Sequence, residues 1–213
     1  EPPHELALEE IDLEYDPDNV WLRRVREVTR AAVDRWQGNV QVSMTDLGGT
    51  LDVLSSFRPG EKLLLDFYDN PARVEQLNWR IHELWWRVYH ELDGVLRSGG
   101  NPGYTAWTPL LSERSSYMLQ CDLSYMIGPE MFDQFCLEDT IECINHVDHA
   151  LYHLDGPAAL CHLPRLLEIE RLHTIQWVYG EGNPPPSKWL DMLREVQHHG
   201  KAIQVWYNIH TTT

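Results

Sequence analysis

The sequence predicts an α/β protein of the (βα)8 TIM-barrel type, of which this chain holds an incomplete portion. Short strands rich in Val, Ile and Trp alternate with amphipathic helices along most of the chain, as a parallel sheet requires. Each expected strand runs into a polar loop, which is typical of strand ends that form an active site. The count reaches about five βα units, whereas a closed barrel takes eight. We therefore expect a single, partial barrel domain over residues 1–213.

Hydrophobic spacing and helix-boundary residues predict the order of the elements. Helices are expected over residues 20–36 and 70–96, the second with Asn70 as its cap and Pro71 in its first turn. Further helices are expected over about 129–147, 158–169 and 187–199, the last with Ser187 as its cap. Strands are expected at 40–44, from 116 to near 122, at 149–154, at 174–180 and at 201–209, and residues 104–110 form a short strand or a loop.

The composition excludes several classes of protein. A hydrophobic share of 43% with 23% charged residues is that of a globular domain. Seventeen Lys and Arg against 33 Asp and Glu give a net charge of -16. A chain with this charge is repelled by a nucleic-acid backbone and by an anionic membrane surface, so binding to either is not expected. The sequence contains no long apolar run and no signal peptide at EPPHELALEE, so we expect a cytoplasmic protein. Four cysteines without CxxC spacing indicate reduced thiols.

Acidic residues and histidines follow the expected strands, at the positions where barrel enzymes place their sites. Crowded carboxylates can transfer protons because one pKa rises while the other group stays ionised. The predicted catalytic residues are Asp122, Asp155 and Glu181. The predicted substrate-binding residues are Asp46, Trp107, Trp177, Asn208 and His210, in which the aromatic rings would hold a sugar, a ring system or a methylated cation.

His153 and Asp155 form a candidate metal site. They stand two apart near the end of a strand, so their side chains point to one side, and imidazole with carboxylate suits zinc or a harder divalent ion. Alternatively, Asp155 caps the next helix or forms an Asx turn, because Gly156 and Pro157 follow it. The sequence contains no GxGxxG, P-loop, HExxH or GxSxG motif, which disfavours Rossmann, kinase and serine-hydrolase functions.

Three blocks of the chain resemble a known family. TDLGGTLDVLSSFRPGEKLLLDFYDNPARV, QCDLSYMIGPEMFDQF and LYHLDGPAALCHLPRLLEI are similar to successive blocks of the uroporphyrinogen decarboxylase superfamily, in particular its divergent methyltransferase-like and decarboxylase-like members. The resemblance spans most of residues 15–210 and implies a (βα)8 barrel with its cleft at the carboxyl ends of the strands. Members of this family are usually longer, so the resemblance implies that the chain is the middle and later part of one.

The resemblance also implies alternative chemistries. Cobalamin-linked methyltransferases of the superfamily carry a His-x-Cys pair that holds a thiol-activating zinc. The matching stretch here, His153-Leu154-Asp155, keeps the imidazole and replaces the thiolate by a carboxylate. The decarboxylases bind their polycarboxylate substrate with N-terminal arginines, which this chain does not match. Acidic residues at the mouth would repel such a substrate, so a neutral or cationic substrate, or one held through a metal, fits better.

The sequence therefore favours a methyltransferase-like enzyme that acts on a small substrate, with a divalent metal such as zinc as cofactor and a corrinoid protein as partner. A homo-oligomer is compatible with these features. The first alternative is a lyase that decarboxylates a carboxylated, tetrapyrrole-like substrate. The second is a non-catalytic barrel that binds a sugar or another small ligand.

Overall fold

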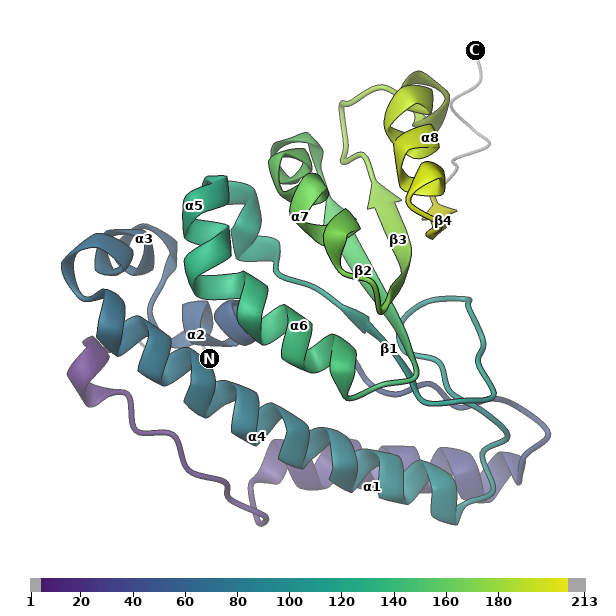
Figure 1. Ribbon diagram of the computed structural model, residues 1–213. Helices are drawn as coiled ribbons and strands as arrows, with labels where there is room; N and C mark the ends of the chain where they lie inside the picture. Colours follow the sequence, from purple (N-terminus) through teal and green to yellow (C-terminus); the bar gives the residue numbers. More distant parts are fainter. Residues whose placement is uncertain (1–4, 207–213) are drawn as a thin grey trace. The chain divides into compact units, whose positions relative to one another are not determined.

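The computed structural model describes residues 5–206, and the chain divides into two compact units, Glu1–Tyr117 and Met118–Thr213. The first unit is helical (Figure 1). Its elements are the 3-10 helix η1 (Leu8–Glu10) and the α-helices α1 (Val20–Trp36), α2 (Thr50–Phe57), α3 (Gly60–Asp69) and α4 (Pro71–Ser98). The helices predicted over residues 20–36 and 70–96 are thus confirmed as α1 and α4.

Helix α4 is the central element of the first unit, because α1, α2 and α3 all pack against it. Its apolar stripe is buried as the spacing predicts; the stripe includes Val74, Leu77, Ile81, Trp85, Leu92 and Val95. The indole of Trp85 also donates a hydrogen bond of 3.0 Å to the carbonyl of Gly48. This bond holds the TDLGGT loop against the helix.

The strand predicted over residues 40–44 is not formed. The N–H and the carbonyl of Val42 both bond to the side-chain amide of Asn101, each at 2.8 Å, and the N–H of Met44 donates to the carbonyl of Thr105 at 2.9 Å. A side chain and a loop, instead of a neighbouring strand, therefore satisfy this backbone. The alternation of Val40 and Val42 describes an extended segment that lies outside any sheet.

The second unit alternates strands and helices (Figure 1). Its strands are β1 (Ser116–Leu119), which begins at the boundary of the units, β2 (His149–Asp155), β3 (Leu172–Val178) and β4 (Ala202–Val205). They form a four-stranded sheet in the order β1-β2-β3-β4, in which β2, β3 and β4 pair in parallel. The α/β class is thus confirmed for this unit. A closed, eight-stranded barrel is not seen within residues 5–206.

The helical runs predicted over about 129–147 and 158–169 are confirmed at 129–145 and 157–168, and the helices of the second unit are short segments. They are α5 (Pro129–Phe132), the π-helix η3 (Asp133–Leu137), α6 (Glu138–Asn145), α7 (Leu163–Glu168) and α8 (Leu190–His198), with the 3-10 helices η2 (Asp122–Met126), η4 (Pro157–His162) and η5 (Pro186–Lys188). The helix predicted from Ser187 begins only at Leu190, because Ser187 belongs to η5 and Trp189 occupies the cap position. None of the described helices is long and apolar enough to cross a bilayer.

The parallel register assigns each side chain to one of the two faces of this sheet. His153 of β2 pairs with Gln176 of β3, which pairs with Gln204 of β4, so these side chains share one face. Their neighbours in the chain, including Trp177, point to the other face. The Trp177 ring lies 5.2 Å from that of Trp189, which precedes α8. The Gln176 face is therefore opposite the face on which Trp189 packs.

Candidate functional site

Three of the predicted site residues lie together in the second unit. One ligand atom each from Asp122, His153 and Asp155 falls within 4.8 Å of the other two, and we call this group the Asp–His–Asp cluster. Asp122 begins η2 just after β1, and the other two residues end β2. The Nε2 atom of His153 lies 4.0 Å from a carboxylate oxygen of Asp155. The cluster is thus at the carboxyl ends of neighbouring strands.

The turn after β2 keeps Asp155 at the end of the sheet. Gly156 has a φ of 78°, in the left-handed region that glycine adopts without strain. Its N–H donates a hydrogen bond of 2.8 Å to the carbonyl of Val178, at the end of β3. The ends of β2 and β3 are therefore fixed side by side.

Gln176 is a hydrogen-bond partner of the His153 ring. Its Oε1 atom accepts a hydrogen bond from the Nδ1 atom of His153, and an amide oxygen can only accept. The proton of the neutral imidazole therefore lies on Nδ1, and Nε2 keeps its lone pair toward the cluster. Metal-binding histidines show this arrangement, in which the second nitrogen donates to a carbonyl group.

Sequence reasoning missed Gln176. The residue is fully buried and lies 23 positions from His153. The available signal was a polar amide in the middle of the apolar strand TIQWV, since buried amides are uncommon and need a partner. Its Nε2 atom has no hydrogen-bond partner among the described residues.

A second histidine supports the helix that carries Asp122. His162 is buried and its ring stacks on Phe132, with centroids 4.3 Å apart. Its Nε2 atom donates a hydrogen bond of 2.9 Å to the carbonyl of Ser124 in η2. Burial lowers the pKa of His162 below its ordinary value of 6.5, against the opposing effect of the hydrogen bonds to Ser124 and Ile127. The imidazole is therefore neutral at pH 7 and ties η4 to η2.

A cavity of about 730 Å³ lies at the same end of the sheet. It is lined by Val178, Tyr179, Gly180, Glu181, Gly182, Asn183, Pro185 and Trp206, and we call it the strand-end cavity. Val178 is the register partner of Asp155. The cavity therefore borders the strand end that carries the Asp–His–Asp cluster.

The other predicted site residues have separate environments. Glu181 is exposed and lines the strand-end cavity. Trp177 is fully buried on the opposite face, against Trp189. We expected this residue to contact the substrate, but in the structure it is a packing residue. Asp46 and Trp107 belong to the first unit; Asp46 accepts a hydrogen bond of 2.9 Å from the Gly48 N–H in a local turn. Asn208 and His210 lie outside the described residues.

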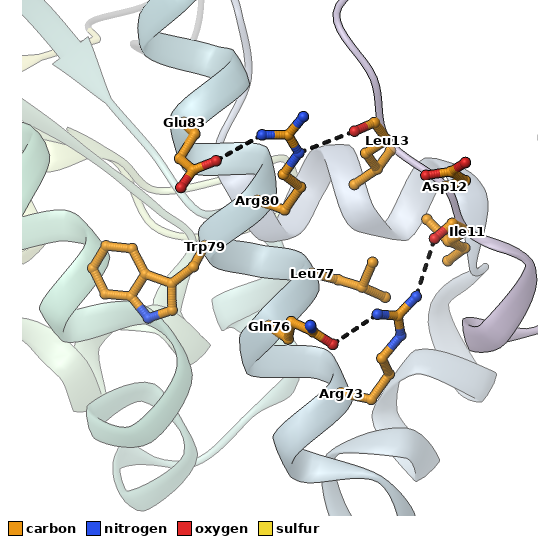
Figure 2. A pocket seen from close by; sticks show the side chains of 9 residues that line it. All are labelled: Ile11, Asp12, Leu13, Arg73, Gln76, Leu77, Trp79, Arg80 and Glu83. Atoms are coloured by element: carbon orange, nitrogen blue, oxygen red, sulfur yellow. Dashed lines mark hydrogen bonds and ion pairs between the residues drawn. The ribbon is translucent and has the colours of Figure 1, made fainter.

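A cavity of about 390 Å³ in the first unit has a structural explanation. It lies between the segment Ile11–Leu13 and α4, and Figure 2 shows Arg73 and Arg80 reaching from the helix to this segment. Arg73 donates to the carbonyls of Leu8 and Ile11 and to Gln76, while Arg80 donates to Leu13 and Glu83. The guanidinium groups thus bind an extended backbone that has no strand partner.

Comparison with solved structures identifies a similar fold. A methyltransferase from Methanosarcina mazei superposes with a TM-score of 0.62 at 13% sequence identity, over 99% of this chain and 66% of that protein. The chain thus spans just under two thirds of the length of this neighbour and shares its fold. No protein-family model matches the sequence, and neither does any curated protein sequence.

Proposed function

We propose that the chain carries the active site of a methyltransferase-like enzyme of the uroporphyrinogen decarboxylase superfamily. The observation that carries this proposal is the Asp–His–Asp cluster, whose three ligand atoms converge within 4.8 Å at the strand ends. The fold shared with a methyltransferase supports it. So does the sequence resemblance, because the methyltransferases of the superfamily have a metal-binding histidine at the position that matches His153.

The residues of the cluster fit a divalent metal such as zinc. Catalytic zinc sites use three protein ligands and leave a position for water or substrate, and one imidazole with two carboxylates is such a set. The Nδ1 bond to Gln176 orients the ring of His153, and Nε2, which lies 4.0 Å from a carboxylate oxygen of Asp155, would be the ligand atom. When bound, the metal would act as a Lewis acid and lower the pKa of a coordinated thiol or water.

The remaining roles follow from position. The strand-end cavity would hold the substrate, with Glu181 at its wall as the group for proton transfer. A corrinoid protein would present the methyl group. Decarboxylation of a carboxylated substrate is less favoured, because none of the described cavity-lining residues is Lys, Arg or His and a substrate carboxylate would lack a counter-charge.

A methyl-transfer assay tests the proposal. The protein, supplied with zinc, is incubated with methylcobalamin and 2-mercaptoethanol. The methyl group passes from cobalt to the thiolate sulfur to give a thioether, and the electron pair of the cobalt–carbon bond stays on cobalt. We expect thioether by mass spectrometry at a rate well above that without protein, and a loss of at least about 100-fold in Asp155→Ala.

The matched control is Asp191→Ala, which removes an exposed carboxylate on α8 and should leave the rate unchanged. Thioether formation no faster than without protein would refute methyl transfer. Release of CO₂ from a carboxylated tetrapyrrole would instead support the decarboxylase alternative.

A further inference from the structure

The lining of the strand-end cavity combines aromatic rings with a carboxylate. Tyr179 and Trp206 supply the rings, Glu181 supplies the charge, and Asn183 adds an amide. Gly180 and Gly182 have φ values of 75° and 80°, so the loop that carries Glu181 folds back after β3 without strain. The N–H of Asn183 donates to the carbonyl of Gly180 at 3.4 Å and closes this turn.

The charges around this cavity favour a cation. Asp155 lies at the adjoining strand end, beside Val178, and the sequence has a net charge of -16. Two arginines of the second unit are engaged with acids elsewhere, Arg165 with Asp133 and Arg194 with Asp191. Carboxylates that face a partly enclosed space attract cations and repel anions.

Lys201, at the opposite end of the sheet, does not supply a counter-charge to the cavity. It is buried just before β4, and its Nζ atom donates to the carbonyls of Ile169 and Leu172 at 2.6 and 2.8 Å. Burial lowers the pKa of this amine below its ordinary value. The strand-end cavity is thus lined by one acidic residue, Glu181, and by no basic residue.

Aromatic faces combined with a carboxylate recognise methylated ammonium groups, because the ring quadrupole attracts a cation that cannot donate hydrogen bonds. We propose that the strand-end cavity binds a quaternary ammonium group, with Trp206 and Tyr179 against its methyl groups and Glu181 as its counter-charge. This names a group that the substrate of the proposed function would carry apart from its methyl-accepting atom, because a quaternary nitrogen has no lone pair with which to accept a methyl group. It rests on that function only in taking the strand ends as the substrate site, and it concerns binding alone.

Calorimetric titration with choline tests the proposal against a neutral isostere. The compound 3,3-dimethyl-1-butanol has the shape of choline without its charge. We expect choline to bind at least about fivefold more tightly, which is the size of a cation–π attraction at a partly exposed site. Equal affinities for the two compounds would overturn the proposal, and so would selective binding of glucose, which would identify a sugar site.

Substitutions identify the groups responsible. Trp206→Leu should weaken choline binding about three- to tenfold, whereas Trp206→Phe, which keeps a ring, should retain most of it. Glu181→Gln should weaken choline binding and leave the neutral isostere unaffected. Its control is Glu170→Gln, which changes an exposed carboxylate just before β3.

These residues are exposed, so their replacement should not alter the unfolding temperature. If choline binding is the same in Trp206→Leu and Glu181→Gln as in the unaltered protein, the cavity is not its site. The result is also independent of the methyl-transfer assay. Choline binding without thioether formation would refute the proposed function alone, and thioether formation without choline binding would refute this inference alone.

Discussion

The side chain of Gln176 fixes the orientation of the His153 ring at the Asp–His–Asp cluster. Its amide oxygen accepts the Nδ1 proton, and Gln176 itself is fully buried. A residue in the middle of one strand thereby fixes the tautomer of a residue on the next. At this scale the chemistry of the site depends on a single buried hydrogen bond.

We predict that Gln176→Leu redistributes the imidazole proton of His153 between its two nitrogens and weakens zinc binding about 10- to 100-fold, because the group that orients the ligand is lost. Gln176→Glu should restore Nδ1 protonation, since a carboxylate accepts the same bond. Nitrogen-15 NMR of the histidine rings measures the tautomer directly. An unchanged tautomer in Gln176→Leu would show that this bond does not set it.

At the scale of elements, the close packing of α1 on α4 restricts which residue can follow α4. Gly99 follows the last residue of α4, and a Cβ atom placed there would lie 2.4 Å from the Cβ atom of Val33 in α1. Its φ of -89° is open to any residue. The requirement for glycine at this position is therefore one of space between two helices.

Two glycine-to-alanine substitutions at α4 should have opposite effects. Gly99→Ala should destabilise the first unit by about 2 kcal/mol or more, because the helices must move apart. Gly94→Ala should stabilise it by roughly 0.5–1 kcal/mol, since Gly94 lies within α4 and a Cβ atom there meets no other atom within 4 Å. Urea unfolding of both variants measures this. If Gly99→Ala is as stable to urea as the unaltered protein, α1 and α4 are not packed this closely at Val33.

At the scale of the whole molecule, the acidic composition makes stability depend on pH at specific carboxylates. Glu91 of α4 accepts hydrogen bonds from Tyr15 and from Arg26 of α1. Burial raises the pKa of Glu91, but the bonds from Tyr15 and Arg26 outweigh this effect and hold the pKa below its ordinary value of 4.5. One carboxylate thus joins the N-terminal segment and two helices.

Because the pKa of Glu91 is lower in the folded state, its stabilisation is complete above pH 4.5 and is lost as the pH falls from there through the folded pKa. We predict that Glu91→Gln lowers the free energy of unfolding by about 1–2 kcal/mol at pH 7. We also expect this free energy to fall less steeply at acid pH in the variant. Urea unfolding across this range tests it, with the exposed Glu83→Gln on the same helix as control. If the free energy of unfolding of Glu91→Gln falls as steeply at acid pH as that of the unaltered protein, Glu91 is not the source of this pH dependence.

Much of the molecule could be predicted from residue patterns. Helical spacing predicts α1 and α4, and short apolar runs predict β2 and β3 near their observed bounds. The i, i+2 spacing of His153 and Asp155 places both side chains on one face of β2, where the structure also brings Asp122. Local periodicity contains this information because it depends on neighbouring residues of one element.

Other features depend on contacts distant in the chain, which periodicity cannot specify. Val42 takes its hydrogen bonds from Asn101, so an alternating segment lies outside the sheet. Trp177 could be assigned to a strand end, but the register of β3 and the packing of Trp189 show that its ring lies on the face away from His153. Gln176 becomes a site residue only through the parallel register of β2 and β3.

A calorimetric titration with zinc tests most directly whether Asp122, His153 and Asp155 act as one site. We predict one zinc ion per chain, with affinity reduced at least about 100-fold in a variant that combines Asp122→Asn and Asp155→Asn. A control that combines Glu170→Gln and Asp191→Asn, both exposed acids of the same unit, should bind zinc as the unaltered protein does. Zinc binding that is equally tight in both double variants would contradict a shared site.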